Sequence, residues 1–66
     1  MEFKEKAKIK LEHWIHHGDH HYEEYVMFAE ELEAAGQSEC ARYIRKMIDL
    51  TSKSTECLKN ALKAFE

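Results

Sequence analysis

Five histidines lie within nine consecutive positions of this 66-residue chain, and the chain has no others. They are His13, His16, His17, His20 and His21, in the run EHWIHHGDHHYEE. Imidazole nitrogen is a common ligand of divalent transition metals, and two histidines four residues apart on a helix lie close enough to share one ion. The spacing therefore predicts a metal site, if a helix carries these residues.

On a helix, the candidate ligands fall on one strip. Two ladders with four-residue spacing cross there: His13, His17 and His21 form the first, and His16, His20 and Glu24 form the second. A complete coordination shell needs further donors, and in a hairpin Cys57 would lie level with His16 as a sulfur candidate. Nitrogen ligands with carboxylate support suit Ni²⁺, Co²⁺ or Zn²⁺, and affinity order alone would rank Cu²⁺ above them.

Composition predicts the helices that must carry this strip. Hydrophobic residues make up 44% of the chain and charged residues 35%, with no proline and two glycines. This predicts an all-α single domain over 1–66, with a helix over about 2–35, a turn at 36–37 and a helix over about 38–65. Gly36 suits the left-handed residue after the first helix, and Ser38 suits the N-cap of the second. So short a turn predicts an antiparallel hairpin.

Apolar positions step by threes and fours along both segments, the spacing of a seam between packed helices. The first seam is predicted at Ala7, Leu11, Trp14, Gly18, His21, Tyr25, Phe28, Leu32 and Ala35, widened by Ile15, Tyr22, Val26 and Ala29. The second is predicted at Cys40, Ile44, Met47, Thr51, Ser54, Leu58, Ala61 or Leu62, and Phe65, with Tyr43, Ile48 and Leu50 beside them.

Two helices alone leave one flank of each seam exposed, and so short a chain buries little core. We therefore expect a homodimer in which two hairpins form a four-helix bundle. A competing architecture breaks the first helix at Gly18 and Asp19 and makes a three-helix monomer. The undisturbed seam through Gly18 favours the hairpin, because one glycine costs a helix only about 1 kcal/mol.

Charge and hydropathy exclude several partners. The formal net charge is −3, so a basic surface for nucleic acid is not expected. No apolar run approaches the roughly 20 residues of a membrane span, and the first residues lack the apolar stretch of a signal peptide. Cys40 and Cys57, 17 residues apart on one helix, cannot form an intrachain disulfide. Cys40 is interpreted first as a small buried or half-buried apolar residue, and Cys57 equally as such a residue or as a metal ligand. We expect a cytoplasmic protein.

The predicted function is storage, buffering or delivery of a divalent metal, with a metal-transport protein or metallochaperone as partner. No nucleophile and base stand out as a pair, and there is no phosphate-binding loop, so an enzyme is not expected. One alternative is a metal-independent helical dimerisation or interaction module. Another is a pH switch, because five imidazoles titrate near neutral pH.

The runs LEHWIHHGDHHYEEYVMFAEELEAAG and ARYIRKMIDLTSKSTECLKNALKAF resemble a small histidine-rich helical-hairpin domain of unassigned function from anaerobic bacteria and archaea. That domain's core reads Leu-x-His-Trp-Ile-x-His-Asn-x-x-His. Gly18 stands where the pattern has Asn. The matching positions are Leu11, His13, Trp14, Ile15, His17 and His21. The resemblance implies a helical hairpin and gives priority to the ladder of His13, His17 and His21, but it implies no established activity.

Overall fold

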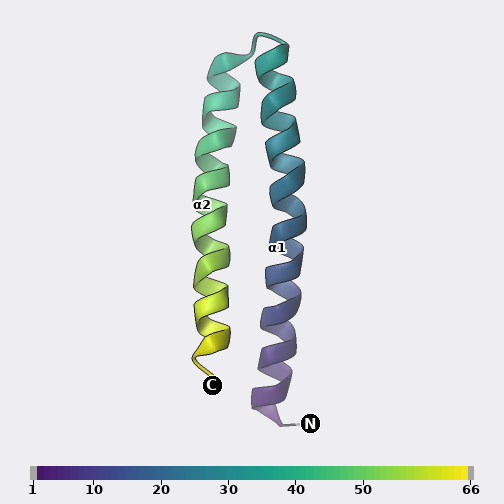
Figure 1. Cartoon of the computed structure of the whole chain (residues 1–66), viewed down its shortest axis with the longest axis vertical. Coiled ribbons are helices and arrows are strands. Elements are labelled where there is room, and N and C mark those ends of the chain that lie inside the picture. Colours follow the sequence, from purple (N-terminus) through teal and green to yellow (C-terminus); the bar gives the residue numbers. More distant parts are fainter. Residues whose placement is uncertain (1, 66) are drawn as a thin grey trace.

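The computed structural model describes residues 2–65, which form two long helices joined by a tight turn. Helix α1 covers Phe3–Ala34 and helix α2 covers Ser38–Lys63, and the two run antiparallel, side by side (Figure 1). The molecule measures 51 × 16 × 12 Å, so it is a rod only one helix thick in its shortest direction. The predicted all-α hairpin is confirmed, with each helix one or two residues shorter than expected at its outer end.

The turn depends on one glycine. Gly36 has a φ of +78°, in the left-handed region, as predicted for the residue that ends α1. The amide of Gln37 then donates to the Leu32 carbonyl at 2.8 Å, which satisfies a free carbonyl at the end of α1. The prediction that Ser38 is the N-cap is wrong, because Ser38 is the first residue of α2. Gln37 is the N-cap and makes no side-chain capping bond.

Helix α1 continues through Gly18, so the three-helix alternative is wrong. The glycine has a packing reason. A Cβ atom built on Gly18 would lie 3.0 Å from Oγ1 of Thr55 on α2, closer than side chains ordinarily approach. Thr55 is itself buried, with 8% of its surface exposed. The two helices therefore approach closely at this level because position 18 has no side chain.

The seam is small and differs partly from the predicted one. Its buried apolar residues are Ala29, Ala41 and Ile48, and no large side chain is fully buried in the described chain. On α1, Trp14 and Phe28 are about half exposed, while their neighbours Ile15 and Ala29 face α2. On α2, the predicted seam residues Cys40 and Ser54 are exposed, and their neighbours Ala41 and Thr55 are buried instead. A hydrophobic stripe wider than the contact left the exact seam ambiguous.

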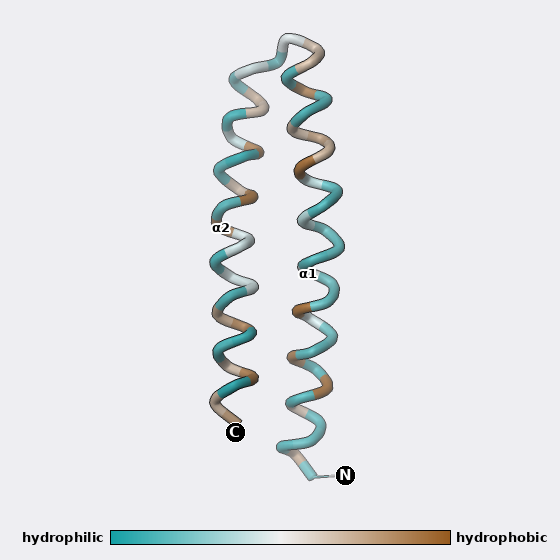
Figure 2. The backbone as a smooth tube through the Cα atoms, viewed as in Figure 1, coloured by the Kyte–Doolittle hydropathy of each residue, from teal (hydrophilic) through white to brown (hydrophobic). Residues whose placement is uncertain are grey.

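A polar stretch interrupts the apolar pattern halfway along the hairpin. Figure 2 shows the middle of α1 as a long hydrophilic run in teal, beside a stretch of α2 that alternates between teal and near-white and has no brown segment. The seam there brings Gly18 against Thr51 and Thr55, without a large aliphatic residue, and the neighbouring Tyr22 is 41% exposed. Neither helix is long and apolar enough to cross a membrane.

One ion pair joins the helices near the turn. Arg45 Nε donates to Glu33 Oε1 at 2.5 Å, with both side chains about half exposed. The hydrogen bond from Arg45 lowers the pKa of Glu33. Desolvation opposes this shift, and the positive charge of Arg45 adds a smaller lowering effect.

The contact between Gly18 and Thr55 gives a testable coupling. Gly18→Ala gains helix propensity but meets Oγ1 of Thr55, so we expect it to be about 1 kcal/mol more favourable to folding in a Thr55→Ala background than in the wild type. Urea unfolding of the wild type, Gly18→Ala, Thr55→Ala and the double variant measures this difference in the free energy of unfolding. Thr55→Val, which keeps a branched side chain of similar volume, is the matched control and should leave the penalty in place. Equal effects in all backgrounds would contradict the contact.

The ion pair gives a pH prediction. Because the folded-state pKa of Glu33 lies below its unfolded value, the pair contributes stability above the unfolded pKa and loses it as pH falls through the folded pKa. Arg45→Met should raise the Glu33 pKa toward its ordinary value in a carboxyl NMR titration. Arg42→Met removes the exposed pair with Glu39 and is the control, because it should leave the Glu33 titration unchanged.

Candidate metal site at the middle of helix α1

The closest approach between two candidate ligands joins His17 and His21. Their Nε2 atoms lie 2.8 Å apart, on successive turns of α1. The pair sits halfway between the ends of α1, Phe3 and Ala34. Two neutral imidazoles can make this contact only if one Nε2 carries a proton and the other presents its lone pair. If a metal cation replaced that proton, the Nε2 lone pairs of His17 and His21 could both coordinate it.

Glu24 lies beside the pair and fits the role of orienting it. One carboxylate oxygen is 3.6 Å from Nδ1 of His21, and the other is 3.1 Å from Nε2 of His20. A carboxylate near Nδ1 favours the proton on that nitrogen, which leaves the lone pair of Nε2 free. His21 thus resembles a metal-binding histidine, with a carboxylate close to one nitrogen, although beyond hydrogen-bond distance, and with the other nitrogen directed at His17.

Ring stacking orients the same residues. The ring of Tyr25, half-buried in the seam, stacks on that of His21 with centroids 5.8 Å apart and an interplanar angle of 12°. The ring of His13 is nearly parallel to that of His17 at 6.2 Å. His13 therefore continues the ladder, although more loosely than the His17 and His21 pair, whose centroids are 4.3 Å apart.

The remaining candidates lie outside this cluster. Within residues 2–65, His16 makes no hydrogen bond, ion pair or ring contact of the kind that joins the others. Cys40 and Cys57 are free thiols on exposed positions of α2. The prediction that Cys40 is a buried or half-buried apolar residue is therefore wrong, and so is the same alternative for Cys57. Nothing in the described hairpin joins Cys57 to the histidines.

The separation of the two nitrogens matches a chelating pair. Two nitrogens bound to one ion at about 2.0–2.1 Å lie about 2.9 Å apart if they subtend a right angle, and about 3.4 Å apart at the tetrahedral angle. The observed 2.8 Å is nearer to the right angle. Yet no group of three or more His, Cys, Asp or Glu side chains in the described part of the chain is already arranged to hold a metal ion. One hairpin therefore offers two preformed ligands and lacks the rest of a shell.

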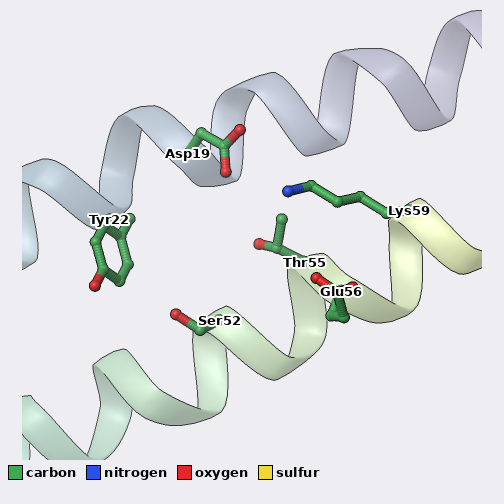
Figure 3. A pocket seen from close by; sticks show the side chains of 6 residues that line it. All are labelled: Asp19, Tyr22, Ser52, Thr55, Glu56 and Lys59. Atoms are coloured by element: carbon green, nitrogen blue, oxygen red, sulfur yellow. The ribbon is translucent and has the colours of Figure 1, made fainter.

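A polar cavity lies elsewhere on the hairpin and was not anticipated from the sequence. Figure 3 shows Asp19 and Tyr22 of α1 above four residues of α2, with the Lys59 side chain reaching toward α1. Its volume is about 220 Å³, and its lining comprises Asp19, Tyr22, Ser52, Thr55, Glu56 and Lys59. None of the predicted histidine ligands, nor Glu24 or Cys57, lines it. The sequence signal was the position of Asp19 and Lys59, each directly after a seam residue.

Comparison with known proteins identifies a family without an assigned activity. Residues 7–65 match the model of a domain of unknown function, DUF8180. The chain belongs to the DUF8180 family. The matched residues cover nearly all of both helices, the turn and every candidate ligand of this DUF8180 domain, in agreement with the expected small domain of unassigned function. No curated protein and no solved structure matches the chain.

Proposed function

We propose that this DUF8180 domain binds a divalent transition metal ion through Nε2 of His17 and His21. The observation that supports it most directly is the 2.8 Å separation of these two nitrogens. The near right angle that this separation allows suits Ni²⁺ or Co²⁺, and also Cu²⁺, better than tetrahedral Zn²⁺. All four ions are nonetheless candidates.

The neighbouring residues take supporting roles in this proposal. Glu24, whose carboxylate lies 3.6 Å from Nδ1 of His21, would favour the tautomer that leaves Nε2 free for the ion. His20 shares the Glu24 carboxylate, and His13 extends the ladder as an additional ligand. His16 and Cys57 make no contact with the cluster within one hairpin, so they rank last among the candidates.

The biological role proposed is storage, buffering or delivery in the cytoplasm, not catalysis. In the single hairpin the histidine pair lies on an open helix surface, from which an ion can pass to or from a metal-transport protein or metallochaperone. The cavity between the helices, at about 220 Å³, is smaller than the roughly 300–1,000 Å³ of ordinary small-molecule sites. An accessible pair of ligands without a substrate cavity suits a carrier.

A homodimer forming a four-helix bundle is part of the proposal, and it is also what a metal-independent interaction module would do. The exposed apolar side chains of Trp14, Phe28, Tyr43 and Leu50 support association. They favour the interaction module as the second candidate function if metal binding is absent.

Calorimetric titration with Ni²⁺, Co²⁺, Zn²⁺ and Cu²⁺ tests the metal proposal on untagged protein. His17→Ala and His21→Ala should each weaken binding at least tenfold, because each removes one of two chelating nitrogens. His16→Ala is the matched control, since it removes a histidine from the same helix but outside the cluster, and it should change affinity less than threefold. Equal losses in all three variants, or no heat with any ion, would contradict the proposed pair.

The supporting role of Glu24 has a separate test. Glu24→Gln keeps the size of the side chain but removes the charge beside Nδ1 of His21, and we expect metal affinity to fall about 10-fold. Glu23→Gln, one position earlier on the helix, is the control. Thermal unfolding with and without chelator then separates the two functions, because only a metal-binding domain should gain stability from the ion.

A further inference from the structure

The two long flanks of the hairpin differ in polarity. On one flank lie the residues that directly follow seam positions, including Glu33 with Arg45 and Asp19 with Lys59. On the opposite flank lie the residues that directly precede seam positions, because the helices are antiparallel. We call this flank the apolar face. It comprises Ala7, Trp14, His21 and Phe28 of α1 and Cys40, Met47, Ser54 and Ala61 of α2.

Each outer edge of the apolar face has its own character. The edge on α1 is charged or polar and comprises Lys10, His17, Glu24 and Glu31. The edge on α2 is apolar and comprises Tyr43, Leu50 and Cys57. Tyr43 and Leu50 are 57% and 58% exposed. The histidine pair therefore lies on the apolar face and its charged edge, away from the polar cavity.

The exposed area indicates how much surface a partner must cover. The hairpin exposes 5278 Å², about 900 Å² more than a compact monomer of 7.8 kDa. A standard protein interface buries about 800 Å² on each partner. One partner bound to the apolar face would therefore cover about as much surface as the hairpin exposes beyond a compact monomer.

We propose that a second copy of this chain covers the apolar face, and that the two copies share one metal ion between their His17 and His21 pairs. The proposal rests on the metal binding proposed above and adds the partner and the stoichiometry. In it, α1 packs antiparallel against α1 of the second copy about a twofold axis perpendicular to the helices, at the level of residues 20–21.

The spacing of charges on the α1 edge fits this axis. An axis at residues 20–21 brings Lys10 level with Glu31 of the second copy, so the dimer gains two ion pairs between these residues. It also brings Trp14 level with Phe28 of the second copy, and these two side chains are about half exposed in the hairpin. The α1 edge is thus complementary to itself when reversed.

The same axis pairs the apolar edge of α2 with itself. Because Gly18 faces Thr55, the axis crosses α2 near residues 52–53, and Leu50 lies within one helical turn of Cys57 of the second copy, which gives the exposed thiol an apolar neighbour. The other symmetric packing, about a twofold parallel to the helices, sets the charged edge of α1 against the apolar edge of α2. It would bury Glu24 and Glu31 near Leu50 and Tyr43, where neither carboxylate has a cationic partner.

The axis also completes the metal site. His21 lies level with His21 of the second copy, and His17 lies level with Glu24 of the second copy, so both histidine pairs meet at the middle of the bundle. Four imidazole nitrogens then surround one ion, twice the number that a single hairpin offers. This accounts for the absence of a group of three ligands within the described hairpin.

Sedimentation equilibrium and nickel titration of the full chain test the arrangement. The expected results are a mass twice that of one chain and one Ni²⁺ per two chains. Phe28→Glu should give a monomer that binds Ni²⁺ at least tenfold more weakly. One ion per chain, a monomer that binds Ni²⁺ as tightly as the wild type, or a dimer insensitive to Phe28→Glu would each overturn the shared site. A dimer of the expected mass that binds no Ni²⁺, Co²⁺, Zn²⁺ or Cu²⁺ would overturn the proposed function and the shared ion together.

A charge exchange tests the register while leaving the histidines intact. Lys10→Glu and Glu31→Lys alone should each weaken the dimer about tenfold, because like charges then face each other at two symmetric positions. The double variant, with Lys10→Glu and Glu31→Lys combined, should restore wild-type association. Glu30→Lys, on the opposite flank, is the control for the charge change. Circular dichroism confirms that each variant is helical, and failure of the double variant to recover would overturn the antiparallel α1 packing.

Discussion

The structure is limited by how little apolar surface two packed helices can bury. Every residue of α1 has only α2 to pack against, so a side chain is buried only where the two backbones come close. That closeness is obtained with small residues: Gly18 against Thr55, and Ala29 and Ala41 toward the turn. Small residues bring the helices together, but each buries little apolar area, and the stability gained is correspondingly small.

The position of the histidines follows from the same constraint. Large aliphatic residues occupy the seam near both ends, at Leu11 and Ile15 and again at Ile44 and Ile48, but not at mid-length. Mid-length is therefore where imidazoles cost the least hydrophobic packing. An ion that binds the folded state adds stability in proportion to the logarithm of its concentration over its dissociation constant. The metal binding that we propose would accordingly be linked to the folding of this region.

How far the sequence predicted this structure can be judged from particular positions. Gly36 and the short turn were sufficient to predict the hairpin. A left-handed residue between two amphipathic helical segments ends the first helix, and so short a connection leaves the second helix few directions other than antiparallel. The exact seam was not predictable. Trp14 and Ile15, Phe28 and Ala29, and Ser54 and Thr55 are neighbouring pairs in which either member fits a three-and-four spacing. In each pair the smaller or branched member faces the other helix, because helices that meet closely at Gly18 and Ala29 leave little space for the indole of Trp14 or the phenyl ring of Phe28.

The sequence predicted the ladder of His13, His17 and His21, but it did not predict that His17 and His21 form the close pair. Helical spacing brought His13, His17 and His21 to one side, and it could not distinguish the 6.2 Å stack of the first two rings from the 2.8 Å nitrogen contact of the last two. That difference depends on side-chain rotamers, which Glu24 and Tyr25 restrain at His21 alone. The aromatic residues that lie outside the seam indicate where a partner could bind. Trp14 and Phe28 are excluded from the seam, and they lie symmetrically about His21, seven residues to either side. A surface with that symmetry is suited to meet its own copy, with the histidine at the centre of the contact.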